Sequence, residues 1–536
     1  MRTIRSRVSW MLVATVVLAG GAGCIGAEQK LAFYNVRDYG AAGSGQAKDT
    51  EAIRKAIDTA ASAGGGTVYF PAGQYLTGAI HLKSNITLYL DAGAVIRFSD
   101  DFDDYLPMVK SRWEGTECTN FSPCIYAYRA ENIAIVGRGL IDGQGKAWWD
   151  YMRKARAQAP GTTKAEPSKW AKLFVEKNPD PPTKARWEQM GNFLRPPMIQ
   201  PFECRNVRIE GVSLQNPPFW TLNPVYCDNL TVTGISIKNP GDSPNTDGIN
   251  PDSCRNVHIS DCHISVGDDC ITIKSGRDAD GRRVGRPCEN ITVTNCTMLD
   301  GHGGVVIGSE MSGGVRKVTI TNCIFDGTER GIRIKTTRGR GGAVEDIRVS
   351  NIVMSNVTRT PFDLNMFYEK SPDEPVSERT PVLRNMHFSD ITVKGAPVAG
   401  FILGLREMPV ENVTFTNVNI DAEKGLSCKD AKNIVLRDVQ INTKKGPALI
   451  CEDTTGLEIE GCTTLSPHAE DAVVDLKNVS DVFLHGCRAT AGTGTFLQLR
   501  GASSRDILLR SNDFRQASSA VKAEDTVPAS ATVQDK

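Results

Sequence analysis

Two adjacent aspartates, Asp268 and Asp269, stand at the start of the apolar run in "SVGDDCITIK" (265–274). The Val, Ile and Thr residues of this run alternate as they do in a buried strand. Neighbouring carboxylates repel each other and lose hydration when they are buried, so their placement here is costly. The pair is therefore a candidate for acid–base chemistry.

Further ionisable residues recur at similar intervals on both sides of this pair. Asp247 precedes it, in "NTDGIN" (245–250). His302 follows it after a somewhat longer interval, in "GHGG" (301–304). Each of these motifs alone is also typical of an ordinary turn or an exposed loop. Their occurrence at successive intervals favours a single site.

Two cations and a tyrosine continue the series. Arg333 and Lys335 alternate in "RGIRIK" (330–335), so a strand would direct both side chains to the same face. Tyr368, in "FDLNMFYEK" (362–370), comes one more such interval beyond Lys335. Alternating Arg and Lys are also common on a solvated strand face. Together with the acids, however, they suggest recognition of an anionic substrate.

The combination of three carboxylates, an imidazole and two cations suggests hydrolysis of a glycosidic bond. A general acid protonates the leaving oxygen, and a second carboxylate activates water or attacks directly. Crowding of the three carboxylates would raise one pKa and keep a proton available. Arg333 and Lys335 would bind the carboxylate of a sugar acid, which makes an acidic polysaccharide such as pectin the expected substrate.

A repeated phrase organises the chain that carries these residues. It begins as "CRNVRIEGVSLQN" at 204, "CDNLTVTGISIKN" at 227, "CRNVHISDCHIS" at 254 and "CENITVTNCTML" at 288, and it continues to 504. The Asn or Asp anchors of successive copies recur at intervals of roughly 20 to 40 residues, a period typical of stacked repeats. Each copy holds a short strand, a bend at Asn, Asp or Gly, and a second short strand, without helical periodicity.

Repeats that cannot bury a face alone must stack on their neighbours. The sequence therefore predicts an all-β fold, a single-stranded parallel β-helix over residues 30–515. Helices between the strands, a Leu-rich consensus and a four-stranded period are missing, which argues against βαβ units, a leucine-rich horseshoe and a propeller. Equivalent residues of consecutive coils should lie about 4.8 Å apart. The candidate residues would then form one edge.

Three segments fall outside the repeat. Residues 145–195, rich in Lys, Trp and Pro, have some helical pattern, and we expect them to form a long insertion that could cover a cleft. Residues 516–536 are small and polar, which predicts a disordered tail. Residues 1–27 are typical of an export signal, with basic residues, an apolar stretch too short for a membrane span and small residues. Acylation at Cys24 and simple secretion are the alternatives.

Composition narrows the possible partners. The 62 basic and 62 acidic residues of the 536 cancel, so no basic excess points to a nucleic acid. We expect a monomer without a metal or another cofactor, exported to the cell envelope or beyond. The absence of His and Cys clusters with zinc-ligand spacing supports the expectation about metal.

Fourteen cysteines remain once Cys24 is set aside. Cys118 and Cys124 are close enough in sequence for a local disulfide, which an oxidising compartment would permit. Several others recur at one place in the repeat and could instead be small apolar residues stacked in a core. These are Cys262, Cys296, Cys323, Cys462 and Cys487.

The motifs "NTDGIN", "GDDC", "GHGG" and "RIK", in this order and spacing, resemble the four signatures of the polygalacturonases, glycoside hydrolase family 28. The stretch "NVRDYGAAGSGQAKDTEAIRKAID" resembles the opening of pectin-active β-helix enzymes, and "RWEGTEC" resembles bacterial members that are often exo-acting. The resemblance spans about residues 33–420. It implies a right-handed parallel β-helix that hydrolyses α-1,4-D-galacturonosidic bonds with inversion at the anomeric carbon.

The resemblance also implies roles for single residues. Asp268 resembles the general acid, and Asp247 and Asp269 resemble the pair that activates water. His302 would orient and tune the acid. Arg333 and Lys335 would bind the substrate carboxylate, Asn245 resembles a supporting residue and Tyr368 a substrate contact.

Three alternatives remain open from sequence. A rhamnogalacturonan or xylogalacturonan hydrolase would share the signatures. A pectate lyase would use carboxylates to bind Ca²⁺ and a cationic base for elimination. A carbohydrate-binding β-helix without catalysis would share only the solenoid. Neighbouring coils also suggest close carboxylates, whereas inverting pairs are typically about 6.5–9.5 Å apart.

Overall fold

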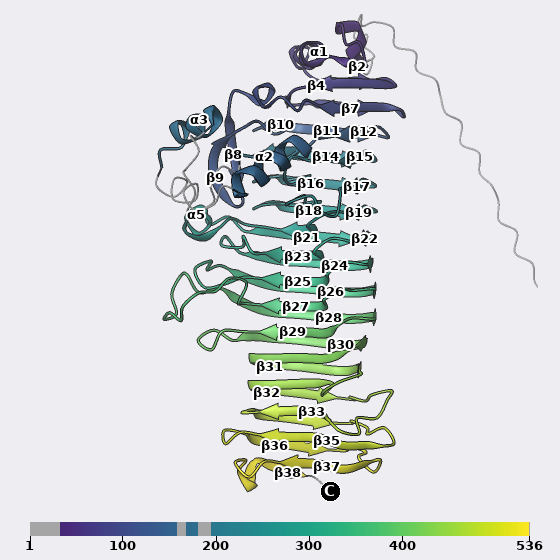
Figure 1. Cartoon of the computed structure of the whole chain (residues 1–536), viewed down its shortest axis with the longest axis vertical. Coiled ribbons are helices and arrows are strands. Elements are labelled where there is room, and N and C mark those ends of the chain that lie inside the picture. Colours follow the sequence, from purple (N-terminus) through teal and green to yellow (C-terminus); the bar gives the residue numbers. More distant parts are fainter. Residues whose placement is uncertain (1–32, 158–167, 181–193, 535–536) are drawn as a thin grey trace, which may run out of the picture.

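The repeats form the coils of a right-handed parallel β-helix, which a computed structural model describes over residues 33–157, 168–180 and 194–534. The coils stack along one long axis from β1 to β38 (Figure 1). Each coil contributes to three rows of parallel strands, here called row A, row B and row C. The predicted all-β solenoid is confirmed. The export signal at 1–27 lies outside the described residues.

Row A is the row that carries the ionisable residues. Isolated bridges at Leu222 and Ile249 continue it between β13 and β20. Its strands are β5 (Ile80–Leu82), β10 (Ile125–Tyr128), β13 (Ile199–Phe202), β20 (Asp269–Ile273), β23 (Gly303–Gly308), β25 (Arg330–Lys335), β27 (Thr360–Asn365), β29 (Val398–Leu403), the first parts of β31 (Lys424–Thr443) and β32 (Leu449–Glu460), β33 (Ala472–Lys477), β35 (Thr493–Arg500) and β37 (Ala517–Ala523).

Row B follows row A in each coil. Its strands are β1 (Phe33–Asn35), β3 (Gly66–Phe70), β6 (Ile86–Leu90), β11 (Glu131–Gly137), β14 (Arg205–Glu210), β16 (Asp228–Thr233), β18 (Arg255–Ser260), β21 (Cys288–Thr294), the first parts of β24 (Val315–Asp326), β26 (Ala343–Ser355), β28 (Val382–Lys394) and β30 (Val410–Ala422), later parts of β31 and β32, β34 (Ser480–His485), β36 (Arg505–Arg510) and β38 (Thr532–Gln534).

Row C closes each coil. Its strands are β2 (Ser44–Lys48), β4 (Gly73–Thr77), β7 (Ala94–Phe98), β12 (Leu140–Asp142), β15 (Ser213–Gln215), β17 (Ser236–Lys238), β19 (His263–Ser265), β22 (Thr297–Leu299), the later parts of β24, β26, β28 and β30, and the end of β31. The bend between rows B and C is where Asn, Asp or Gly recurs in the sequence.

Apolar side chains of equivalent coil positions stack inside the solenoid. In row B, one such stack runs through Val207, Leu230, Val257 and Ile291. All of them are buried. Burying each such side chain contributes about 1.5–3 kcal/mol, so the stacks are the main source of stability between coils.

The cysteines belong to these stacks. Register places Cys262 beside Cys296 and Cys296 beside Cys323, as predicted. All fourteen cysteines in the described part of the chain are buried and unpaired. The disulfide that sequence allowed between Cys118 and Cys124 is therefore not formed, and both thiols are buried as small apolar groups.

Asparagines form a second ladder, at the entrance to row B. Asn132, Asn206, Asn229, Asn256 and Asn290 all have a left-handed backbone, with φ between 54° and 59°. Each side-chain amide donates to the oxygen of the Asn one coil earlier, as from Asn256 to Asn229 at 3.2 Å. Asn tolerates this conformation better than most residues, which explains why it anchors the repeat.

Charges alternate in the position next to this ladder. Register aligns Arg205, Asp228, Arg255 and Glu289 in four consecutive coils. Glu131 precedes them, and the alternation continues through Arg316, Glu345, Arg384, Glu411 and Lys432. Ion pairs join several neighbours, for example Arg316 and Glu289 at 2.7 Å.

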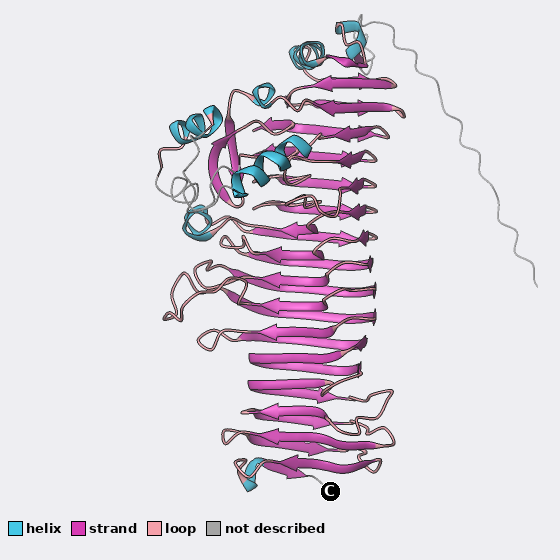
Figure 2. Ribbon diagram, in the orientation of Figure 1, coloured by secondary structure: helices cyan, strands magenta, loops and turns pink. Residues whose placement is uncertain are grey.

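Helices and a hairpin lie outside the strand rows of the solenoid. The amphipathic helix α1 (Thr50–Ser62) packs its Ala and Ile face on the first coils and covers that end of the core. The antiparallel hairpin β8 (Val109–Trp113) and β9 (Thr116–Asn120) stands beside row A together with α5 (Asp278–Val284), on one side of the solenoid (Figure 2). The 3₁₀ segments are η1 (Val36–Tyr39), η2 (Phe102–Tyr105) and η3 (Ala529–Ala531).

The insertion at 145–195 is helical where it is described. It contains α2 (Lys146–Ala157) and α3 (Lys169–Lys177), while 158–167 and 181–193 lie outside the described residues. Trp148 of α2 stacks on Phe102 with ring centroids 3.7 Å apart. The Asn178 side chain, at the end of α3, accepts from the Thr119 amide at 2.7 Å. The described part of the insertion therefore supports the hairpin.

The C-terminal segment corrects the predicted disordered tail. β37 pairs with β35 and β38 pairs with β36, and Ala531 is buried. Its small polar side chains bury little apolar area, which is why composition indicated disorder. The open edge of the last coils supplies backbone hydrogen bonds instead. None of the helices in the described residues has the length and apolar character needed to cross a membrane.

The asparagine ladder leads to a stability prediction. We expect Asn256→Ala to lower the free energy of unfolding by about 1–2 kcal/mol, because alanine is strained in the left-handed conformation. Asn256→Gly removes the same hydrogen bonds without that strain and should cost less. Urea unfolding followed by circular dichroism compares the two variants. A glycine variant no more stable than the alanine variant would contradict the backbone explanation.

Candidate active site

Row A brings the sequence candidates onto consecutive coils. The bridge between Ile249 and Ile271 aligns Asp247 with Asp269, and β20 aligns Asp269 with Gly303, the residue after His302. One coil further, β25 carries Arg333 and Lys335. Residues separated in sequence by a full repeat thus become lateral neighbours in space.

The three aspartates converge. One carboxylate oxygen from each of Asp247, Asp268 and Asp269 lies within 4.8 Å of the other two. Asp247 and Asp269 are buried, and Asp268 is half-buried at the surface of the pocket. Such crowding is unfavourable unless nearby cations and hydrogen-bond donors compensate it.

Asp269 is compensated by the two predicted cations. Lys335 Nζ lies 2.7 Å from Asp269 Oδ2, and Arg333 Nη1 lies 3.7 Å from Oδ1. Both cations are largely buried, and both point to the same face of β25 as the i, i+2 spacing predicted. Tyr368 lies against them, with its ring centroid 5.3 Å from Lys335 Nζ.

His302 contacts Asp268. Its Nδ1 lies 3.1 Å from Asp268 Oδ1, and its backbone amide donates to the Asp268 carbonyl at 2.8 Å. This hydrogen bond raises the pKa of His302. Burial opposes ionisation of Asp268, but the hydrogen bond from His302 and the charge of Lys335 outweigh burial and lower the pKa of Asp268.

Asp247 has the opposite tendency. Burial and then repulsion from Asp268 raise its pKa well above the usual value, although Lys274 partly offsets this. The surroundings of Asp247 therefore favour its protonated form. The sequence predicted that crowding would raise one of the three pKa values, and the raised pKa is that of Asp247.

Asn245, the last of the predicted residues, also lies at the site. It has a left-handed backbone, with φ of 54°, and its side-chain oxygen accepts from Arg195 at 2.8 Å. Together with the three aspartates, Lys335 and Tyr368 it lines a pocket of about 360 Å³. His302 and Arg333 are not part of this lining but contact it, His302 at Asp268 and Arg333 at Asp269.

Seven further residues line the same pocket. They are Glu114, Trp220, Lys274, Arg277, Ser309, Glu310 and Glu369. Sequence could have identified Lys274, because "CITIK" ends in Ile-Lys as "GIRIK" does. Strand register places Lys274 and Lys335 at the same position, two coils apart. Trp220 and Glu369 follow no motif that sequence could have singled out.

Lys274 and Glu310 form a buried ion pair at 2.9 Å. Lys274 Nζ also lies 4.0 Å from Asp247 and 4.6 Å from the ring centroid of Trp220. Burial would favour the neutral amine, but Glu310 and Asp247 outweigh it and raise the pKa of Lys274. Lys274 therefore supplies a permanent positive charge beside Asp247.

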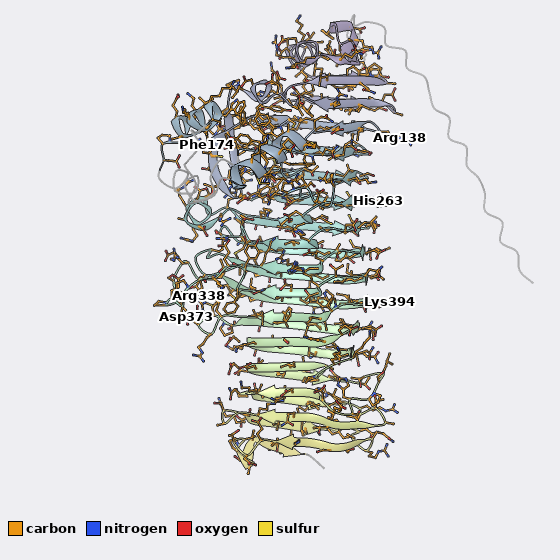
Figure 3. All side chains as sticks on the ribbon, in the orientation of Figure 1. Arg138, Phe174, His263, Arg338, Asp373 and Lys394 are labelled. Carbon is orange, nitrogen blue, oxygen red and sulfur yellow. The ribbon has the colours of Figure 1, made fainter. Side chains whose placement is uncertain are left out.

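Arg277 links three of the segments that line the pocket. It pairs with Glu114 of the hairpin tip at 3.5 Å, with Glu310 at 3.4 Å and with Glu369 at 3.2 Å. Glu369 belongs to the loop after β27. Asp373 of the same loop lies with Arg338 on one side of the solenoid, opposite Lys394 (Figure 3). The pocket is thus bounded by the hairpin and this loop.

Comparisons with known proteins agree with this geometry. Residues 184–465, more than half of the chain, match the family described as glycosyl hydrolases family 28, and residues 33–140 match a family described as rhamnogalacturonase A/epimerase, pectate lyase-like. A solved exopolygalacturonase from Thermotoga maritima is 36% identical, with a TM-score of 0.66 over 76% of this chain and 91% of that chain.

Two curated relatives extend the comparison. A probable polygalacturonase from Vitis vinifera is 31% identical over 72% of this chain and 73% of its own length. An endo-polygalacturonase from Pectobacterium carotovorum subsp. carotovorum is 30% identical over 72% of this chain and 87% of its own length. By the family match and by these relatives, the chain is a glycoside hydrolase and belongs to the glycosyl hydrolases family 28.

Proposed function

We propose that the protein hydrolyses α-1,4-D-galacturonosidic bonds of polygalacturonan. The observation that carries this proposal is the pocket in which three carboxylates lie beside Lys335 and Arg333. The carboxylates provide general acid and base, and the two cations provide a binding site for the carboxylate of a sugar acid. The polygalacturonases among the relatives support the same substrate.

In this proposal Asp268 protonates the leaving oxygen, while Asp247 and Asp269 activate the attacking water. Asp268 is the most exposed of the three and has the His302 hydrogen bond. A substrate carboxylate bound to Lys335 and Arg333 would weaken their attraction for the carboxylates and raise the pKa of Asp268. Binding would thereby favour the protonated form of Asp268, which donates its proton to the leaving oxygen.

We further propose net inversion and exo action. Inversion is supported by the family resemblance; the carboxylate oxygens lie within 4.8 Å of each other, closer than the about 6.5–9.5 Å between carboxyl groups of typical inverting pairs. Exo action is supported by the hairpin tip at Glu114 and the Glu369 loop, which Arg277 holds together across one end of the pocket. We infer that this junction closes one end of the pocket, so that a substrate chain enters from the other end.

Export is part of the proposal. The basic and apolar residues within 1–27 support secretion or retention at the envelope through an acylated Cys24. A secreted enzyme would meet a polymeric plant substrate directly. Mass spectrometry of the mature N-terminus distinguishes the two routes.

The role of Asp268 is tested by an isosteric substitution. We expect Asp268→Asn to lower kcat at least about 100-fold, because the variant has no proton to donate. Release of reducing ends from polygalacturonic acid measures the effect. Asp300→Asn is a matched control, since Asp300 lies just before His302 but outside the pocket lining. Full activity of Asp268→Asn with an intact fold would contradict a catalytic role.

The rival lyase reaction is tested by removing metal. Lys335 and Lys274 already compensate Asp269 and Asp247, so the carboxylates do not need a cation. We expect an excess of chelator to leave the rate unchanged and the products to lack the ultraviolet absorbance of unsaturated uronates. Loss of activity with chelator, together with absorbing products in its absence, would instead establish elimination.

The mode of action is tested on the earliest products. We expect chromatography of a polygalacturonic acid digest to show monomer or dimer from the first time point. Proton NMR of the same samples should show the β-anomer first, since the substrate bond is α. A ladder of oligomers would contradict exo action, and an initial α-anomer would contradict inversion.

A further inference from the structure

Asp247 is held by a residue that does not line the pocket. The side-chain amide of Asn250 donates from Nδ2 to Asp247 Oδ2 at 2.9 Å. Asn250 is fully buried, and its Oδ1 has no hydrogen-bond partner among the described residues. The contact with Asp247 is therefore the only polar contact of this amide in the described part of the chain.

A chain of buried amides leads to Asn250 along row A. Gln200, Asn223 and Asn250 occupy the same position in three consecutive coils, next to the bridged residues Ile199, Leu222 and Ile249. Gln200 donates to the Asn223 side chain at 2.8 Å, and Asn223 donates to the Asn250 backbone carbonyl at 2.8 Å. All three side chains are fully buried.

The chain of buried amides begins at the hairpin. Ser111 of β8 is fully buried and donates to Gln200 Oε1 at 2.8 Å. Because the oxygen of Gln200 accepts there, its nitrogen must donate onward. Asn223 is oriented in the same way, with its side-chain oxygen accepting from Gln200 and its side-chain nitrogen donating to the Asn250 carbonyl. The hairpin that bounds the pocket is thus joined to the segment that carries Asp247.

We propose that Asn250 is a positioning residue that fixes the Asp247 carboxylate and favours its ionised form, with Gln200 and Asn223 holding the Asn250 backbone in place. This inference rests on the proposed function, in which Asp247 activates water. An ionised carboxylate is stabilised by a donor that needs no reorganisation. Asn250 provides such a donor from behind, without occupying space that the substrate needs.

Charged groups also act on Asp247, and Asn250 is distinct from them. Asp268 and Asp269 disfavour its ionised form, whereas Lys274 and Lys335 favour it. Lys274 is 4.0 Å away and is engaged by Glu310. Asn250 is closer than Lys274 and uncharged, so its effect should be insensitive to a bound uronate.

The test compares Asn250→Ala with the isosteric Asn250→Asp. Loss of the donor raises the pKa of Asp247, so the acidic limb of the kcat profile should move upward by about one pH unit, equivalent to about a tenfold lower kcat at a pH below the limb. Asn250→Asp should shift the limb further, because it places a fourth acid beside Asp247. KM should stay unchanged, since Asn250 does not line the pocket.

A control variant distinguishes an effect of Asn250 on Asp247 from a purely structural role of Asn250. Thr454 is equally buried and donates to the Glu452 carbonyl at 3.0 Å in a later coil. Thr454→Val should lower thermal stability and leave both limbs in place. The isosteric Asp variant keeps the packing at 250 even if the Ala variant does not fold.

Two further outcomes separate this inference from the proposed roles. Unmoved limbs in the folded Asn250 variants would overturn it. An upward shift of only the alkaline limb would support the Asn250–Asp247 contact but show that Asp247 works in its protonated form, which would overturn the assignment of Asp247 as a base.

Discussion

The regular stacking of coils is the constraint on which the rest of the structure depends. Strand pairing fixes equivalent residues of adjacent coils side by side, at about 4.8 Å. Residues that are far apart in sequence, such as Glu345 and Arg384, therefore become neighbours without any help from the loops. Asp247, Asp269 and Lys335 meet because each occupies a defined position in row A. The positions of the site residues are therefore fixed by the strand pairing of row A.

Charge compensation is the second condition for the site. Three carboxylates in one buried corner would be too costly alone. Lys335 stabilises Asp269 and His302 stabilises Asp268, whereas burial and repulsion from Asp268 raise the pKa of Asp247. Each compensating group comes from a different coil or loop. The unequal partners are what separate the three carboxylates chemically, although they share one residue type.

Sequence predicted the solenoid, and it predicted that the eight candidate residues would lie close together, because the repeat period determines which residues of successive coils are neighbours. It could not identify which of the three pKa values is raised, since the pKa of Asp247 depends first on burial and then on the balance between Asp268 and Lys274. The pocket residues Trp220 and Glu369 lie in irregular segments whose paths the repeat does not determine. Composition wrongly predicted disorder for residues 516–536, because β37 and β38 are stabilised by strand pairing rather than by apolar burial. Sequence also left the pairing of Cys118 and Cys124 open, because closeness in sequence does not specify whether two thiols face each other.

The alternating charges beside the asparagine ladder have a consequence for how such a solenoid can change its length. Arg255 lies between Asp228 and Glu289, so every coil here meets opposite charges above and below. Duplication or deletion of a single coil would bring two like charges together at the junction, whereas a change of two coils would preserve the alternation. Each exposed ion pair contributes only about 0–1 kcal/mol. Two like charges at the junction, however, are unfavourable for both of the coils that meet there. Within this stretch, growth by pairs of coils is therefore the less costly route, and the charge pattern acts as a parity rule on the number of coils.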